Sequence, residues 1–349
     1  MTVHTYFLGA NTPDGFFSYY NELFRDGRLR KTVILKGGPG CGKSTLMRAV
    51  GKQANDLGFE SEQLLCSSDP NSLDGIIISD AGLAIVDGTA PHILEPPLCG
   101  CGAEYLNLSA CYRSSRLGER KKMLERVKQQ NAACYPLASA CFQAAKAAAD
   151  ALFALIKPEG LHAFTVALSG ARRSASGSGS VLRRFYTALS PMGAMHCPLP
   201  CKTVWRLEDS YGAAPLVLSE AASRLQAAGF DIILGYSPLA PKSVVQLFIP
   251  ELSTAYTASD ALFPYSYETA GVYDLDALCT QRFSAQDARH AASLLHLKNQ
   301  AASEGIQFLS EAKQYHDRLE ALYRDAVDFS FVEEETEKMK QQLVRMLPA

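Results

Sequence analysis

The chain has 349 residues, about twice the length of a common domain, so two domains are expected. Hydrophobic residues make up 47% of the chain and charged residues 20%, which excludes a disordered chain. The 34 basic and 36 acidic residues give a net charge of −2, without the basic surplus of a nonspecific nucleic-acid surface. The N-terminal segment lacks the pattern of a signal peptide, and no stretch resembles a membrane span. We therefore expect a cytoplasmic protein that uses no membrane and no nucleic acid.

The first strong motif lies at residues 37–44, which fit the pattern G-x-x-x-x-G-K-[ST] in full. The β-branched apolar run 32–35 predicts a buried strand before the motif, and apolar residues recur at helical spacing after it. A strand, a glycine-rich loop and a helix in this order are typical of a P-loop. We therefore expect an α/β fold of tandem P-loop NTPase-like parallel-sheet domains, each with a helical tail or insertion.

The residue types of the motif suit a bound nucleotide. Glycines let the backbone turn its N–H groups toward phosphate oxygens, and the positive end of the following helix points at the same phosphates. Lys43 would contact the β- and γ-phosphates and act in catalysis, and the Ser44 hydroxyl would ligate Mg²⁺. The predicted contacts to ATP come from Gly38, Pro39, Gly40, Cys41, Gly42, Lys43, Ser44 and Thr45.

A loop at 66–74 and a strand at 83–86 follow the predicted helix. Asp69 and Pro70 indicate a turn, although Asp69 or Asp74 could also face the γ-phosphate and orient a water molecule. The apolar run 83–86 ends at Asp87, and ligands of open α/β sheets bind at the carboxyl ends of the strands. We predict Asp87 as the catalytic acid that holds Mg²⁺, with Asp80 as the alternative.

Ten cysteines occur in the chain, but their spacing is poor for a metal site. Cys99 and Cys101 are separated by one residue, no C-x-x-C pair occurs, and no histidine follows at zinc-finger spacing. Reduced thiols that pack as small apolar residues explain this pattern. Whether Cys99 and Cys101 bind a metal stays open.

The next segments are a basic stretch and a helical tail. Residues 111–122 carry several arginines and lysines, which suit either a phosphate-binding lid or a solvated helix start. Phe142, Ala145, Ala149, Leu152 and Ile156 are spaced by three and four residues, so a long helix is expected. Lys-Pro-Glu-Gly at 157–160 ends it. The first domain is therefore placed at residues 1–158.

The remaining residues, 161–349, contain a weak second copy of the first domain. A shift of 171 residues aligns 32–89 with 203–260 without a gap and gives eight identities in 58 positions. The resemblance of 162–164 to 4–6 suggests that 168–180 corresponds to 8–15, although a flexible loop fits this composition better. A second helical tail is predicted from apolar spacing at 309–323, and Ser284 and Asp287 fit an acidic capping box.

The second copy has lost its phosphate chemistry. In the alignment the second-copy residues are Glu208, Asp209, Ala214, Pro215 and Ala258, in the places of Gly37, Gly38, Lys43, Ser44 and Asp87. We therefore predict a nucleotide-free pseudo-copy that docks on the first copy. Arg172, Arg173 and Arg206 are candidates, by charge alone, for an arginine offered to the first site.

The combined motifs at 37–45, 66–75 and 86–92, followed by a helical insertion and a second round, resemble a known family. The chain is similar over nearly its whole length to poorly characterised, duplicated bacterial P-loop ATPases of the Firmicutes type. The resemblance implies ATP binding through the first P-loop. Members of the family often keep the second P-loop, and this sequence departs from them there.

Three functions remain open at this point. The first is an ATPase that hydrolyses Mg-ATP at the first domain, with a structural or regulatory second domain. The second is a small-molecule or nucleotide kinase with residues 111–122 as its lid, and the third is a nucleotide-sensing module. GTP is less favoured than ATP because no N-K-x-D motif appears.

Overall fold

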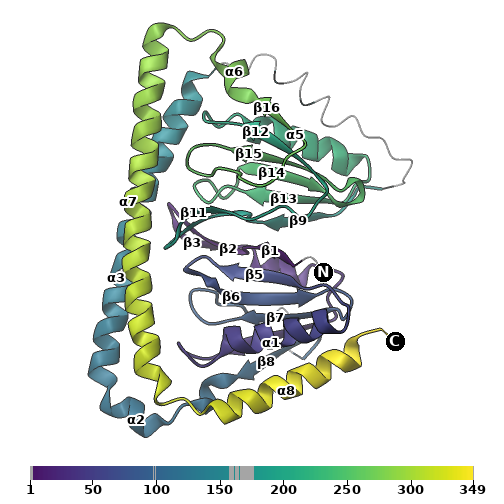
Figure 1. The fold of residues 1–349 in the computed structure, drawn as a ribbon, viewed down its shortest axis with the longest axis vertical. Helices are drawn as coiled ribbons and strands as arrows, with labels where there is room; N and C mark the ends of the chain where they lie inside the picture. Colours follow the sequence, from purple (N-terminus) through teal and green to yellow (C-terminus); the bar gives the residue numbers. More distant parts are fainter. Residues whose placement is uncertain are drawn as a thin grey trace.

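The computed structural model describes residues 3–96, 98, 100–156, 161, 165 and 177–348. They form an α/β fold in which two six-stranded mixed sheets lie beside a pair of long helices (Figure 1). The domain boundary predicted at 157–160 lies outside the described residues, as does most of segment 168–180.

The first sheet has the strand order β1-β5-β6-β7-β4-β8. Its strands in chain order are β1 (His4–Tyr6), β4 (Lys31–Lys36), β5 (Glu62–Cys66), β6 (Asp69–Ile78), β7 (Leu83–Asp87) and β8 (Ala103–Asn107). β4 is buried on both faces, because Val33 and Leu35 enter one apolar core and Ile34 enters another.

The second sheet repeats the order and the directions of the first, as β9-β13-β14-β15-β12-β16. Its strands are β9 (Val181–Arg184), β12 (Thr203–Glu208), β13 (Ile232–Tyr236), β14 (Val244–Ile249), β15 (Thr254–Ser259) and β16 (Gly271–Asp274). The helices that follow β4 and β12 are α1 (Lys43–Asp56) and α5 (Ala214–Ala227), which the shift of 171 relates residue by residue.

One strand in each sheet runs against the predicted parallel direction. β6 is antiparallel to β5 and β7, and β14 is antiparallel to β13 and β15. Two residues separate β5 from β6 and four separate β6 from β7. A parallel crossover needs about a dozen residues or more, so these short turns force the chain to reverse.

The C-terminal helix α8 (Phe329–Met346) packs against the first half of the chain, although it belongs to the second half in sequence (Figure 1). Val332, Met339 and Leu343 of α8 share an apolar core with Met47 and Val50 of α1. A fragment of residues 1–158 would therefore lose part of the core that covers α1.

The helices α3 (Lys121–Leu155) and α7 (Ala285–Arg324) form a long antiparallel pair, called the helical arm below (Figure 1). Both predicted helical tails are confirmed, and the capping box of Ser284 and Asp287 begins α7. The two helices approach closely at Gly305, where a Cβ would lie 2.3 Å from the Phe142 ring. The short helices α2 (Ser114–Glu119) and α6 (Leu275–Thr280) precede the two arm helices.

The two halves meet at a pair of hairpins, β2 (Gly9–Thr12) with β3 (Gly15–Ser18) and β10 (Thr187–Ser190) with β11 (Gly193–His196). Phe7 and Phe185 exchange two backbone hydrogen bonds of 2.8 and 2.9 Å. The Asn11 side chain donates to the Leu189 carbonyl at 3.0 Å. Because β9 takes the place of β1 in the second sheet, the counterpart of hairpin β2–β3 is 187–196. The suggested match of 8–15 to 168–180, which the sequence favoured less than a flexible loop, is therefore wrong.

A buried ionic network lies beside this contact. Arg184 of β9 donates to the Glu62 carboxylate of β5 at 2.7 Å, and the Tyr6 hydroxyl donates to the same oxygen at 2.7 Å. The guanidinium group also lies 3.9 Å from the Tyr6 ring centroid. Burial disfavours the charged carboxylate, but Arg184 and Arg28 outweigh it and lower the pKa of Glu62 from 4.5 to about 2.

This pKa predicts acid-sensitive stability. A carboxylate with a lowered pKa stabilises the folded state above its unfolded pKa, and this contribution disappears as the pH falls from about 4.5 to about 2. The shift corresponds to about 3 kcal/mol. Glu62→Gln should therefore lower the free energy of unfolding at pH 7 and lose this difference in acid, measured by urea unfolding across pH.

The exposed neighbour Glu60 provides the control. Glu60→Gln should follow the wild-type profile at every pH. A Glu62→Gln variant with wild-type stability at pH 7 would contradict the network.

Candidate functional site

The glycine-rich loop of residues 37–42 joins β4 to α1. Gly40 and Gly42 have φ angles of +69° and +86°, in the left-handed region that glycine adopts without strain. Gly42 is the N-cap of α1, and it supplies no side-chain cap to the first turn. The loop therefore presents backbone donors and the positive end of a helix, which together suit an anion.

Lys43 and Asp87 come together at this loop. Lys43 Nζ lies 3.6 Å from Asp87 Oδ2 and donates to the carbonyls of Gly37 and Gly38 at 2.7 and 3.0 Å. Asp87 is the last residue of β7, which pairs in parallel with β4. Its other oxygen, Oδ1, accepts from the backbone N–H and the hydroxyl of Thr89. Both chemical groups predicted from the motif are thus at one edge of the sheet.

The other predicted residues differ in position. Ser44 Oγ accepts the backbone N–H of Leu73 in β6 at 3.0 Å, and Thr45 is exposed. Asp80 lies in the turn before β7, at the opposite end of that strand from Asp87, so the structure does not bring it to the loop.

The two other acidic candidates also have separate environments. Asp69 pairs with Lys313 of α7 at 3.4 Å. Asp74 is buried in β6, one strand away from Asp87. Burial raises the pKa of Asp74, His92 lowers it, and the negative charge of Asp87 raises it further.

The end of the helical arm covers the loop, and sequence reasoning missed this. A Cβ on Gly40 would lie 3.4 Å from the backbone oxygen of Glu320 in α7. A hydrogen bond from His316 lowers the pKa of the Glu320 carboxyl, and a further hydrogen bond from the Gly40 backbone N–H also lowers it. One donor of the loop therefore already faces a carboxylate of the second half.

Two more side chains, from outside the loop, pack against it. The Tyr112 hydroxyl donates to the Pro39 carbonyl at 2.9 Å. A Cβ on Gly42 would lie 2.9 Å from a methyl group of Val332 in α8. These contacts join positions far apart in the chain, so no local sequence pattern predicts them.

The corresponding loop of the second half contains its own anion. The Asp209 carboxylate accepts the backbone N–H groups of Ala213 and Ala214 at 2.7 and 2.9 Å, at the start of α5. Asp209 is buried, and burial raises its pKa to about 6 although these two hydrogen bonds lower it.

The strand register corrects one part of the predicted alignment. Leu35 pairs with Asp87 in the first sheet, and Leu207 pairs with Ala258 in the second. β12 is therefore shifted by one residue relative to the gap-free alignment. Glu208 consequently takes the place of Lys36, and Asp209 takes the place of Gly37.

The basic segment 111–122 does not offer a group of unpaired positive charges to the loop. Its arginines contact the turn between α7 and α8. The Arg116 side chain donates to Asp325 O at 2.8 Å and the Arg120 side chain to the Asp325 carboxylate at 3.1 Å. The Arg113 backbone N–H donates to Ala326 O at 2.8 Å, and its guanidinium lies 3.9 Å from Asp328 Oδ2.

The remaining candidate arginines and cysteines lie away from the loop or outside the described residues. Arg206 pairs with Glu208 of its own strand at 2.8 Å. Arg172, Arg173 and Cys99 lie outside the described residues, and Cys101 is exposed.

No family model matches the chain, and no curated protein or solved structure gives a match. The resemblance to duplicated P-loop ATPases therefore stays a prediction. In the part of the chain that the structure describes, no helix has the length and apolar character that a membrane crossing needs.

Proposed function

We propose that the first half of the chain binds Mg-ATP at residues 38–45 and hydrolyses it. The observation that carries this proposal is the 3.6 Å approach of Lys43 Nζ to Asp87 Oδ2, beside the uncapped start of α1. Phosphoryl transfer depends mainly on positioning and charge neutralisation, and this edge of the sheet supplies both.

Each residue has a role that follows from its contacts. Lys43 donates to two neutral carbonyls, and an anionic phosphate is a stronger acceptor for an ammonium group. Asp87 and the Ser44 hydroxyl are oxygen ligands of the kind that Mg²⁺ prefers. The metal would neutralise charge on the phosphates, while loop N–H groups orient them.

The second half is proposed to bind no nucleotide. Asp209 supplies an anion to the α5 N-terminus from within the chain, and a phosphate would have to displace this buried carboxylate. Ala214 and Ala258 provide neither the ammonium group nor the acid. The second half then acts on the first by covering its loop through α7 and α8.

A kinase has weaker support than hydrolysis. The side chains of Arg116 and Arg120, which suggested a lid over a phosphoryl donor, contact the α7–α8 turn instead. A nucleotide-sensing module differs from an ATPase in turnover alone, so the assay below separates the two.

Substitutions at Lys43 and Asp87 test the proposal. Lys43→Ala should lower ATP turnover by about 10²–10³-fold, the usual effect of removing one group that stabilises developing charge. Asp87→Asn should reduce Mg²⁺-dependent turnover more than Asp80→Asn, because Asp80 lies at the other end of β7. Phosphate release from ATP measures both effects, and circular dichroism checks the fold. A Lys43→Ala enzyme with wild-type turnover would refute the site.

The number of bound nucleotides tests the second half. Titration calorimetry with a nonhydrolysable ATP analogue and Mg²⁺ should give one equivalent per full-length chain and none for Lys43→Ala. The physical reason is that Asp209 occupies the second helix terminus. Two equivalents would show that the second half binds nucleotide after all.

The Glu320 contact predicts competition with phosphate. Glu320→Gln replaces a charged acceptor with a neutral one, and the two kinds of hydrogen bond differ by about 1 kcal/mol. ATP affinity should rise about fivefold in titration calorimetry, since 1.4 kcal/mol is about tenfold. Glu304→Gln, at an exposed position of the same helix, is the matched control. Unchanged or weaker affinity in Glu320→Gln would exclude competition.

A further inference from the structure

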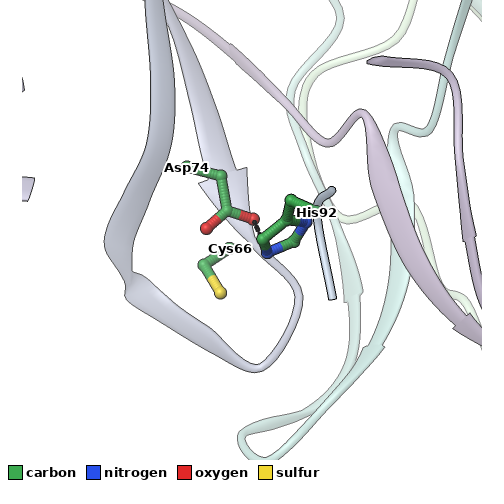
Figure 2. A group of neighbouring side chains, drawn as sticks. All are labelled: Cys66, Asp74 and His92. Atoms are coloured by element: carbon green, nitrogen blue, oxygen red, sulfur yellow. Dashed lines mark ion pairs between the residues drawn. The ribbon is translucent and has the colours of Figure 1, made fainter. Parts of the chain in front are cut away.

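Three side chains with metal-binding atoms come together at the first sheet (Figure 2). Cys66 ends β5, Asp74 lies in β6, and His92 follows β7. One ligand atom from each lies within 4.8 Å of the other two, and His92 Nε2 lies 3.2 Å from Asp74 Oδ2. Because β5, β6 and β7 are neighbours in the sheet, the fold itself brings these residues together.

Polar atoms around this cluster lack hydrogen-bond partners. Among the described residues, they are Asp74 Oδ2, His92 Nδ1 and Ser67 Oγ, all buried. The Tyr20 hydroxyl and the Cys66 thiol interact with the Asp74 carboxyl, and both interactions lower its pKa. The 3.2 Å contact of His92 with Asp74 does not have hydrogen-bond geometry. Buried polar groups are nearly always paired, so unpaired atoms on both Asp74 and His92 favour a ligand at this cluster.

Aromatic side chains hold the imidazole in place. The ring centroid of His92 lies 4.7 Å from that of Phe16 and 5.3 Å from that of Tyr20, both in edge-to-face arrangements. The ring is 7% exposed, and Asp74 is 4% exposed. Because burial of an unpaired charge is costly, a carboxyl group this deep either stays protonated or gains a positive partner such as a metal ion.

The charge of the surroundings favours a cation. Gly75 pairs with Val86 in the antiparallel ladder, so Asp74 and Asp87 are the next residues along the two strands. Lys43 faces Asp87, and His92 faces Asp74. Lys43 neutralises the charge of Asp87, and a divalent ion beside Asp74 would neutralise the negative charge of this second carboxylate.

The donor atoms indicate which ion fits. Thiolate and imidazole select borderline and soft metals, whereas Mg²⁺ and Ca²⁺ prefer sets of oxygen ligands. Zinc binds sulfur at about 2.3 Å and nitrogen or oxygen at about 2.0–2.2 Å, which places tetrahedral ligands roughly 3.3–3.8 Å apart. The 3.2 Å separation of His92 Nε2 and Asp74 Oδ2 is close to this range, and all three ligand atoms lie within 4.8 Å of one another.

The second half provides an internal comparison. Gln246 and Thr257 form the ladder pair that corresponds to Gly75 and Val86, so Val245 takes the place of Asp74. The same shift of 171 puts Ser237 at the position of Cys66 and Phe263 at that of His92. All three donors are missing there, in the half that also lacks Lys43 and Asp87.

We propose that Cys66, Asp74 and His92 bind one zinc-class divalent metal ion per chain, with a fourth coordination position left for water or a substrate group. This site is separate from the Mg²⁺ of the proposed nucleotide site, and it does not depend on ATP binding. A buried cysteine–histidine–aspartate group that works without metal is the competing explanation.

Metal binding by the full-length, reduced protein tests the proposal. After removal of metal with a chelator, the wild type should take up one Zn²⁺ per chain in competition with a chromophoric chelator. Co²⁺ should give the near-ultraviolet thiolate-to-cobalt charge-transfer band. Cys66→Ser should lose this band and weaken Zn²⁺ binding by more than about 100-fold, since even indirect partners of a metal ligand change affinity by about 10–100-fold.

Control variants keep the result interpretable. Cys201→Ser, at a half-buried cysteine of the second half, should retain the cobalt band and the zinc affinity. Zinc should raise the thermal unfolding temperature of the wild type and of Cys201→Ser, but not of Cys66→Ser, Asp74→Asn or His92→Gln. If a variant does not fold, the wild-type cobalt spectrum still decides.

Two outcomes would overturn the proposal. One is a reduced wild type that binds no Zn²⁺ or Co²⁺, and the other is a bound metal without thiolate ligation or unaffected by Cys66→Ser. Neither result bears on ATP binding, which depends on Lys43 and is measured by calorimetry.

Discussion

The contact between the two halves is the constraint on which the rest of the molecule depends. Phe7 and Phe185 exchange backbone hydrogen bonds, and next to them Arg184 crosses to Glu62 in a buried position. One apolar core continues from the first sheet through the hairpins into the second sheet. Removing one partner of a buried ion pair costs about 3–5 kcal/mol because the other charge is left unpaired. The two halves are therefore held together by buried contacts as well as by the covalent chain. The second half can cover the first site even though it lacks phosphate-binding residues.

The two copies differ in which anion faces the N-terminus of the helix that follows β4 or β12. Each has a helix whose first N–H groups face the carboxyl edge of a sheet, and such a helix end favours an anion. In the second half, Asp209 at the end of the preceding strand provides that anion, so the N–H groups of Ala213 and Ala214 have an acceptor within the chain. In the first half, the loop has glycines instead, and the carboxylate that accepts a loop N–H is Glu320 on a helix distant in sequence. The Glu320 carboxylate can leave the loop with its own helix, whereas the Asp209 carboxylate stays tethered beside the N–H groups that it accepts.

Local patterns predicted the local parts of this structure well. The loop at 37–42, the helix from Lys43 and the strand ending at Asp87 follow from glycine spacing and apolar runs, and the capping box at Ser284 is present. The direction of β6 was missed because it depends on turn length rather than on apolar pattern. The covering of the loop by α7 and α8, and the cluster in the first sheet, were missed for another reason. The contacts that cover the loop join residues separated by most of the chain, whereas Cys66, Asp74 and His92 are near in sequence and meet only through the pairing of neighbouring strands. His92, Glu320 and Val332 carry no local sign of these contacts. The one-residue shift of β12 was also hidden, because a gap-free alignment hides a loop that is shorter by one residue.

The helical arm gives the proposed nucleotide site a mechanical connection to the second half. Near its start, α7 is anchored by Lys298, which is buried and pairs with Asp260 beside the second sheet at 2.7 Å. Near its end, the same helix places Glu320 against the loop. The 22 residues between these points span about 33 Å of continuous helix. On the proposed function, a phosphate that displaces the Glu320 carboxylate either rotates this side chain away or shifts the last turns of the helix. A ligand shifts such an equilibrium only by the difference in its affinity for the two states. The coupling is thus limited by how much better the loop binds phosphate than carboxylate, and that difference is set at Gly40 and Lys43.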